Sequence, residues 1–308
     1  MNGVVIKTTG KRYTVKTEEG EVVQSRLKGK FRIAGIKSTN PIVVGDKVEV
    51  VQESELWMIV KLHDRKNHIL RKSVNLSKQT HIIAANIDQA LLMITLDSPV
   101  TTTGFIDRFL VAANAYGIEV VLLFNKVDLL DDELKIQQEN LQKIYEKIGY
   151  TCFATSVIND DLSQIKDLMK GKVNMISGHS GVGKSTLINY LQPDLHINTK
   201  EVSDTHKQGQ HTTTFSELHE LDFGASIIDT PGIRGFGLVE LEVAVLGSYF
   251  PEFFKLKSQC KYHNCIHKNE PQCAIKSALE DGDIAESRYK NYLKMLIEEQ
   301  EHFRTTDY

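Results

Sequence analysis

The stretch GHSGVGKST, residues 178–186, decides the fold of this 308-residue chain. It matches the pattern G-x-x-x-x-G-K-[ST], follows an apolar segment at 172–177 that we expect to be a strand, and opens an expected helix. In this context glycines let backbone N–H groups surround phosphate oxygens, a lysine brings its charge to the β- and γ-phosphates, and a hydroxyl ligates Mg²⁺. We therefore predict a nucleotide-binding P-loop formed by Gly178, His179 (through its backbone), Ser180, Gly181, Val182, Gly183, Lys184, Ser185 and Thr186.

The motif DTPG, residues 229–232, follows the apolar segment ASIID and completes the phosphate site. An aspartate at the end of such a strand is expected to hold Mg²⁺, so we assign this role to Asp229. Gly232 can donate its backbone N–H to the γ-phosphate. The next residue is Ile233, whereas many GTPases use a glutamine there to orient the attacking water.

The polar segment KQGQHTTT, residues 207–214, lies between these two motifs and is interpreted as a switch. Thr213 is expected to contact Mg²⁺ and the γ-phosphate, with Thr212 and Thr214 as alternatives. His211 is the nearest candidate to position the water, and it is equally compatible with a solvated loop histidine. The predicted catalytic residues are therefore Lys184, Thr213 and His211.

The motif NKVD, residues 125–128, is typical of guanine recognition, and it precedes the P-loop in this chain. Asp128 can accept hydrogen bonds from guanine N1–H and N2–H₂, Asn125 can hold the loop, and the stem of Lys126 can cover the ring, with Val127 between them. Adenine lacks that donor pair, so a buried carboxylate would remain unpaired at a cost of about 1–3 kcal/mol. We also expect the backbone N–H of Ser156 to meet guanine O6.

The motifs of a GTPase are thus present in a rotated order, and the segments around them predict the fold. Apolar strands alternate with amphipathic helices from about 80 to 236, including a helix at 132–148. This alternation predicts an α/β fold with a mostly parallel sheet. A parallel sheet tolerates a new chain start where the old ends lie close together, so we predict a circularly permuted α/β P-loop GTPase core at 73–238.

The N-terminal segment, residues 1–72, reads as five short strands without helical periodicity, which predicts an OB-type β-barrel or, as the alternative, an SH3-like barrel. The net charge of the whole chain is −3, yet residues 1–75 hold 15 of the 37 basic residues and 8 of the 40 acidic ones. This excess favours an RNA-binding domain, although a solvated basic surface explains it equally well.

Three of the four cysteines cluster in the C-terminal segment, residues 239–308, where a long amphipathic helix is also expected around 284–302. The spacing C-x4-C-x-H-x5-C brings together three thiolates and one imidazole, a closed tetrahedral set for a structural Zn²⁺. The predicted ligands are Cys260, Cys265, His267 and Cys273, with His263 as an alternative to His267. We therefore predict a helical zinc-binding domain at 239–308.

The sequence resembles the circularly permuted bacterial GTPases of small ribosomal subunit biogenesis, the RsgA family. The resemblance rests on NKVD before GHSGVGKST, on GQHTTT, on DTPGIRGFGL and on the Cys/His cluster. It implies an OB domain, a permuted GTPase core and a zinc domain in which His267 is the ligand. It also implies GTP and GDP with Mg²⁺ as ligands, binding to the small ribosomal subunit and its rRNA, and hydrolysis stimulated by that subunit.

Two other functions are compatible with parts of the sequence. An RNA-binding assembly factor with a vestigial nucleotide site would not need intact Lys184, Ser185, Asp229 and Asp128, and a small-molecule kinase would not need NKVD. The longest apolar runs, at 90–96 and 120–124, are too short to span a bilayer. We therefore expect a cytoplasmic monomer without a membrane partner.

Overall fold

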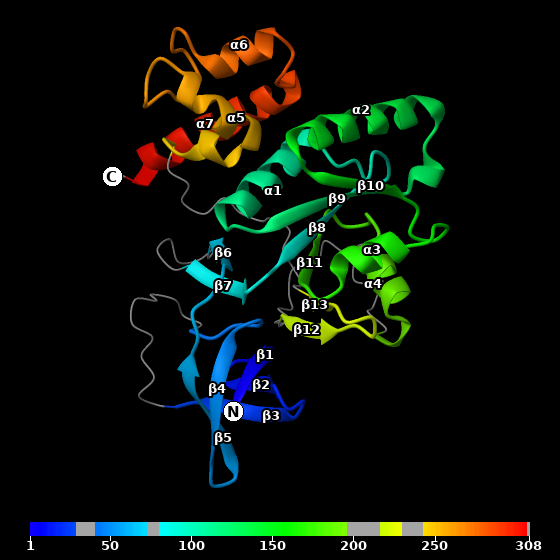
Figure 1. Cartoon of the computed structure of the whole chain (residues 1–308), viewed down its shortest axis with the longest axis vertical. Coiled ribbons are helices and arrows are strands. Elements are labelled where there is room, and N and C mark those ends of the chain that lie inside the picture. Colours follow the sequence, from blue (N-terminus) through cyan, green and yellow to red (C-terminus); the bar gives the residue numbers. More distant parts are fainter. Residues whose placement is uncertain (29–40, 73–79, 196–215, 230–242, 307–308) are drawn as a thin grey trace.

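The computed structural model describes residues 1–28, 41–72, 80–195, 216–229 and 243–306. Figure 1 shows three parts in a row: a β-barrel that contains the N-terminus, a central sheet flanked by helices, and a helical module that contains the C-terminus. The order of these parts matches the predicted fold class.

The N-terminal barrel is closed and has OB topology. Its strands are β1 (Asn2–Thr9), β2 (Arg12–Thr17), β3 (Val22–Leu27), β4 (Lys47–Glu53) and β5 (Leu56–Leu62). They are ordered β1-β2-β3-β5-β4, the β3–β5 pair is parallel, and β1 also pairs with β4. An SH3-like barrel would join its strands in sequence order, so this alternative is wrong. Period-2 alternation places the core side chains inside, namely Val5, Val15, Val23, Val48, Val50 and Ile59.

Two strands that we did not predict connect the barrel to the core. Strands β6 (His68–Lys72) and β7 (Thr80–Ala85) form a separate antiparallel pair. Asn67, just before β6, makes two hydrogen bonds with the backbone of Ile87. Its Nδ2 donates to the Ile87 carbonyl at 2.7 Å, and its Oδ1 accepts from the Ile87 N–H at 2.9 Å. The side chain of Asn67 thereby fixes this pair to the start of the core.

The central part is a sheet with helices on both faces. Its elements are β8 (Gln89–Ile94), α1 (Thr103–Ala115), β9 (Glu119–Asn125), η1 (Val127–Leu129), α2 (Asp132–Ile148), β10 (Thr151–Thr155), α3 (Ser163–Met169), β11 (Val173–Ser177), α4 (Lys184–Leu191), η2 (Pro193–Leu195), β12 (Glu217–Glu220) and β13 (Ser226–Asp229). Alternate residues of β8 face opposite layers: Leu92 and Ile94 pack with α1 and α2, whereas Leu91 and Met93 pack with α3 and α4.

The strand order shows how the permuted chain builds one continuous sheet. The order is β10-β9-β8-β11-β13-β12, and all neighbours are parallel except β12 and β13. The chain enters at β8 in the middle, runs outward to β10, and returns at β11 beside β8. The direction of the strand order therefore reverses between β8 and β11, and ligands of α/β sheets bind at the carboxyl ends of strands at such a point.

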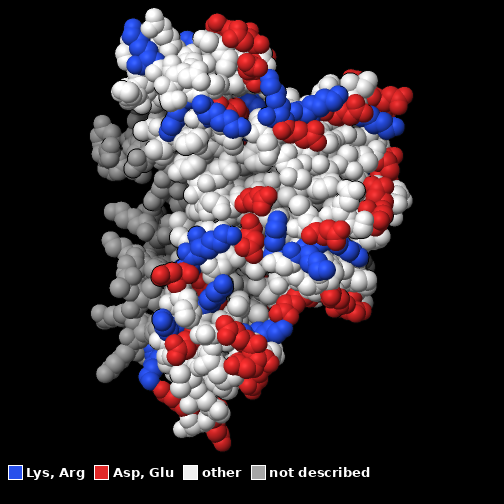
Figure 2. Space-filling model, in the orientation of Figure 1, with Lys and Arg blue, Asp and Glu red and all other residues white. Residues whose placement is uncertain are grey.

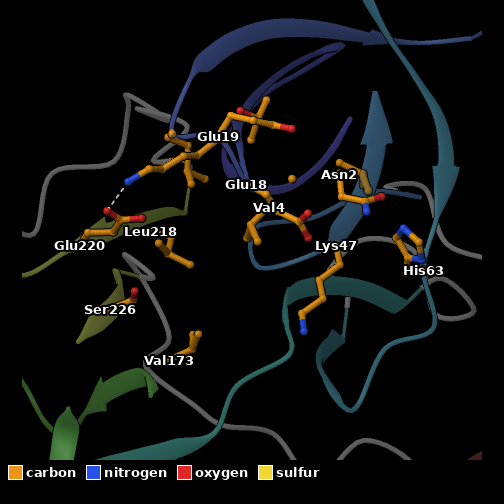
Figure 3. A pocket seen from close by; sticks show the side chains of 16 residues that line it. Asn2, Val4, Glu18, Glu19, Lys47, His63, Val173, Leu218, Glu220 and Ser226 are labelled. Carbon is orange, nitrogen blue, oxygen red and sulfur yellow. Dashed lines mark hydrogen bonds and ion pairs between the residues drawn. The ribbon is translucent and has the colours of Figure 1, made fainter. Parts of the chain in front are cut away.

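The barrel and the core share hydrogen-bonded strands. Strand β1 pairs with β12 at Lys7 and Glu217, so the two parts form an 11-stranded sheet. The Nζ of Lys7 lies 2.8 Å from a carboxylate oxygen of Glu217, and Lys16 forms an ion pair with Glu220. Beside this junction lies a cavity of about 720 Å³ between barrel residues such as Lys47 and core residues such as Ser226 (Figure 3).

The C-terminal module packs against α1 of the core. It contains η4 (Leu246–Tyr249), α5 (Pro251–Leu256), η5 (Lys257–Gln259), α6 (Ala274–Glu280) and α7 (Glu286–Thr306). Val111 of α1 joins the hydrophobic cluster of this module, which is formed mainly by Leu246, Phe250, Phe253, Ile275, Tyr292, Met295 and Leu296. The module and the core therefore share a buried interface.

A charged network lies inside this interface. Arg288 of α7 is 1% exposed and donates from Nη1 to Asp107 Oδ1 of α1 at 2.7 Å. The same guanidinium donates to both carboxylate oxygens of Glu252 in α5, at 2.8 and 3.0 Å. Asp107, which has no exposed surface, also accepts from Tyr145 at 2.7 Å and from Asn291 at 2.6 Å. Burial of such charges is tolerated because every one of them is paired.

None of the helices within the described ranges has the length and apolar character required to cross a lipid bilayer.

Candidate functional site

The P-loop lies where the strand order reverses. Strand β11 ends at Ser177 and helix α4 begins at Lys184, as the sequence predicts. All three loop glycines have positive φ, and two of them lie against neighbouring strands: Gly178 with φ 140° and Gly183 with φ 104°. A Cβ at Gly178 would lie 2.6 Å from the Met93 carbonyl oxygen, and one at Gly183 would lie 2.5 Å from Asn125 Nδ2. Only glycine fits these positions, so the loop shape depends on them.

The side chain of Lys184 points into the P-loop. Its Nζ donates to the carbonyl oxygens of Gly178 at 2.8 Å and His179 at 2.6 Å. Burial lowers the pKa of Lys184 from its ordinary value. The ammonium group is thus held inside the loop, at the position from which it can turn to phosphate oxygens.

His179 has a contact that the sequence did not predict. Its ring packs on Phe105 of α1 with the ring centroids 3.9 Å apart. Burial, and secondarily the charge of Lys184, lowers the pKa of His179. The ring of His179 therefore joins the P-loop to the first turn of α1, and the role of its backbone toward the phosphates stays a prediction.

Asn125 connects three loops of the site. It is 4% exposed, its Nδ2 donates to the Val182 carbonyl in the P-loop at 2.8 Å, and its Oδ1 accepts from the Val157 N–H at 3.1 Å. Val157 lies in the loop after β10. The loop after β9 is thereby fixed both to the phosphate-binding loop and to the loop predicted to lie near guanine O6.

Of the remaining NKVD residues, Lys126 and Val127 are half-buried and Asp128 is exposed. Lys126 has a left-handed conformation with φ 62°, and its Nζ donates to the Ser98 carbonyl at 2.7 Å. Val127 begins η1, which contains Asp128. Asp128 is exposed, and its Oδ2 accepts a hydrogen bond from Asn159 Nδ2 at 3.1 Å. The carboxylate is thus accessible to a base and held from one side.

The backbone N–H of Ser156, which we expect to meet guanine O6, has a partner within its own loop in this structure. Its N–H donates to Oδ2 of Asp160 at 2.5 Å, so this donor is already used within the loop. Asp160 also accepts from the Thr155 hydroxyl at 3.2 Å. Ser156 contributes instead through its Oγ, which accepts from Asn159 Nδ2 at 3.1 Å. Sequence position alone does not show that Asp160, four positions later, accepts from this N–H.

Several predicted residues lie outside the described residues. They are His211, Thr212, Thr213, Thr214, Gly232 and Ile233. The backbone of Asp229 is described: it ends β13 and pairs with Glu217. Because β13 is the parallel neighbour of β11, Asp229 and the P-loop lie at the same edge of the sheet.

The predicted metal ligands come together in the C-terminal module. The ligand atoms of Cys260, Cys265, His267 and Cys273 all lie within 4.8 Å of one another. His267 Nδ1 lies 3.7 Å from Cys260 Sγ and 3.4 Å from Cys273 Sγ. Tetrahedral zinc with ordinary Zn–S and Zn–N bonds separates such atoms by about 3.6 Å. The four residues therefore fit a zinc ion, and His267 belongs to the cluster as predicted.

Glu270, which the sequence did not single out, organises the loop that carries His267. Its carboxylate accepts from the backbone N–H groups of Ile266 at 2.9 Å, Lys268 at 2.8 Å and Asn269 at 3.0 Å. Burial raises the pKa of Glu270, but these backbone hydrogen bonds outweigh it and hold the pKa below its ordinary value. Tyr289 supports the same loop by donating to the His267 carbonyl at 2.8 Å.

Fold and site together define the class of this protein. A mostly parallel sheet carries a P-loop after β11 and an NKxD motif after β9, and the chain reaches β9 before β11. Asn125 joins the two motifs in space. This arrangement is that of a circularly permuted P-loop GTPase.

Comparison with known proteins identifies the family. The family described as RsgA GTPase matches residues 62–239, and the RsgA N-terminal domain matches residues 2–56. The chain is 57% identical over 313 residues to the small ribosomal subunit biogenesis GTPase RsgA of Flavobacterium johnsoniae, with 100% of this chain and 96% of that protein covered. It is 50% identical over 303 residues to the protein of the same name from Bacteroides fragilis, with 98% of both covered.

Solved structures agree with this assignment. The crystal structure of YjeQ from Thermotoga maritima matches with a TM-score of 0.78 and 36% identity, over 96% of this chain and 97% of that one. YloQ, described as a circularly permuted GTPase, matches with a TM-score of 0.78 and 29% identity, over 98% and 95%. The chain belongs to the RsgA GTPase family, whose enzymatic activity is GTP hydrolysis to GDP and phosphate.

Proposed function

We propose that this GTPase acts in late maturation of the small ribosomal subunit, binds the subunit and its rRNA, and hydrolyses GTP faster when bound. The names of the curated relatives support this proposal. The observation that carries the nucleotide part is the pair of hydrogen bonds from Asn125 to Val182 and Val157, which joins base and phosphate loops. The protein works in the cytoplasm as a monomer.

The proposed nucleotide site combines two groups of residues. Residues 178–186 bind the phosphates, with Lys184 on the β- and γ-phosphates and Ser185 on Mg²⁺. Asp229 holds Mg²⁺, Gly232 donates to the γ-phosphate, and Thr213 and His211 act from the switch. Asn125, Lys126, Val127 and Asp128 bind guanine. The four ligands of the Cys/His cluster hold one Zn²⁺, which stiffens the C-terminal module and leaves no open position for catalysis.

The barrel is the proposed rRNA-binding domain, and the boundaries of the three domains are 1–72, 73–238 and 239–308. OB barrels commonly bind nucleic acids. Figure 2 shows basic and acidic side chains interspersed over the visible face of the barrel, so the charge on this face is mixed. The basic excess of this segment also includes Lys30, Arg32 and Lys37, which lie outside the described residues. Binding through such scattered charges is expected to weaken steeply with salt.

The test is steady-state hydrolysis of GTP and ATP by the full chain, with and without purified small ribosomal subunits. We expect GTP to be hydrolysed in preference to ATP and the rate to rise when subunits are added. Lys170→Ala is the control for Lys184→Ala. Lys170 is exposed at the end of α3, so its replacement should leave the rate of GTP hydrolysis unchanged. GTP hydrolysis that does not respond to subunits would refute the ribosomal part of the proposal and leave the GTPase assignment intact.

A further inference from the structure

Asn159 links two loops that come from different strands. Its Nδ2 donates to Asp128 Oδ2 at 3.1 Å and to Ser156 Oγ at 3.1 Å. Its own N–H donates to the Ser156 carbonyl at 2.9 Å. Asp128 follows β9, whereas Ser156 and Asn159 follow β10. One side-chain amide therefore joins the predicted guanine-binding carboxylate to the neighbouring loop.

We propose that Asn159 is a positioning residue that sets guanine selectivity by fixing the orientation of the Asp128 carboxylate. This inference rests on the proposed role of Asp128 in binding guanine. A carboxylate at an exposed position rotates freely, yet accepting two hydrogen bonds from N1–H and N2–H₂ requires its plane to coincide with that of the base. A donor that holds Oδ2 from the side restricts this rotation before the nucleotide arrives and lowers the cost of ordering it.

The chemistry of an amide suits this position. The NH₂ group has two hydrogens, and one reaches the carboxylate while the other reaches the hydroxyl of Ser156. An aspartate would place a second negative charge beside Asp128, and an alanine would offer no donor. The loop is itself held, because Asp160 accepts from the Ser156 N–H at 2.5 Å and from the Thr155 hydroxyl at 3.2 Å. These hydrogen bonds fix the backbone of the loop that carries Asn159.

The hydrogen bond between Asn159 and Asp128 should contribute to nucleotide affinity and not to the stability of the protein. Asp128 and Asn159 are both exposed in this structure, where water competes for their hydrogen bond. A bound base would cover the carboxylate and exclude that water, which strengthens a hydrogen bond to a charged group. Loss of Asn159 is therefore expected to leave the fold unchanged and to weaken the contact with the base.

The experiment measures the affinities of the full chain for GTP and for inosine triphosphate (ITP), which lacks the 2-amino group and presents only N1–H to Asp128. In Asn159→Ala we expect about five- to tenfold weaker GTP binding and a smaller loss for ITP, so the GTP/ITP ratio falls. Asn140→Ala, an exposed asparagine of α2, serves as the control and should change neither affinity.

Two outcomes for Asn159→Ala would overturn the proposal. Unchanged GTP affinity would show that the amide does not position Asp128. Equal losses for GTP and ITP would show that Asn159 only supports the loop, because a general loosening does not distinguish the 2-amino group. Asp128→Asn is measured in parallel: if it retains full GTP affinity, the role of Asp128 itself fails, whereas a loss there with no effect of Asn159→Ala rejects only this inference.

Discussion

Replacement of Arg288 by alanine tests how firmly the C-terminal module is fixed to the GTPase core. Arg288 is 1% exposed and pairs with Asp107 and Glu252. Its loss leaves the carboxylates of Asp107 and Glu252 without a positive partner, and breaking such a buried pair costs about 3–5 kcal/mol. Asp107 keeps its donors Tyr145 and Asn291, so we expect the lower end, about 3 kcal/mol. This corresponds to a fall in Tm of roughly 6–12 °C.

The loss of stability in Arg288→Ala should also depend on pH. Burial raises the pKa of Asp107, and the charge of Arg288 opposes this rise. Without Arg288, the folded-state pKa of Asp107 lies still further above its unfolded value, so the folded variant binds a proton that the unfolded chain releases. The stability of the variant is therefore favoured at acid pH and lost as pH rises. We expect a smaller difference from wild type at about pH 5 than at about pH 8.

Thermal unfolding of the full chain, followed by calorimetry at both pH values, measures these effects. Arg108→Ala is the control, because the Arg108–Glu298 pair is 35% and 38% exposed and should contribute less than about 1 kcal/mol. The triple change Asp107→Asn, Glu252→Gln and Arg288→Met removes all three charges and should cost less than Arg288→Ala alone. A loss for Arg288→Ala no larger than that of the control, or one independent of pH, would refute the reasoning.

Four further predictions concern the nucleotide site, the barrel and the metal cluster. Lys184→Ala should abolish GTP hydrolysis and leave the circular dichroism spectrum unchanged, because only phosphate charge is removed; wild-type turnover would reject the P-loop assignment. Asp128→Asn should weaken GTP binding and favour xanthosine triphosphate, whose C2 oxygen would meet a donor, and a titration with both nucleotides checks this preference. Removal of residues 1–72 should weaken binding to small ribosomal subunits and flatten its salt dependence; an unchanged salt slope would contradict a role for the barrel. Elemental analysis should find one zinc per chain, and Cys273→Ser should lose it and lower the Tm; a metal-free wild-type chain would contradict the zinc assignment.

Local signals explain why much of the fold could be predicted from the sequence. The helix expected at 132–148 is α2, because Asp131 caps its N-terminus and Gly149, with φ 113°, ends it. The barrel strands follow from period-2 alternation, and the P-loop follows from glycines whose positions have no room for a side chain. Each of these features is determined by a few consecutive residues and can therefore be predicted from the local sequence.

The features that were missed depend on contacts between distant residues. Arg288 and Asp107 are 181 positions apart, and the sequence around each of them does not predict a buried charge pair. Strand β12 contains only four residues, ELHE, and lacks an apolar run. The hydrogen bond from the Ser156 N–H to the side chain of Asp160 was not predicted, because sequence position does not show which acceptor is nearer.

The pairing of β1 with β12 has a consequence for the core as an isolated piece. Strand β12 is the last strand of the core sheet, and an uncovered edge strand offers N–H and C=O groups that pair readily with another molecule. The barrel covers this edge and places Lys7 and Lys16 against Glu217 and Glu220. Without the barrel the core would expose the backbone N–H and C=O groups of β12, so the barrel ends the growth of the sheet at this edge.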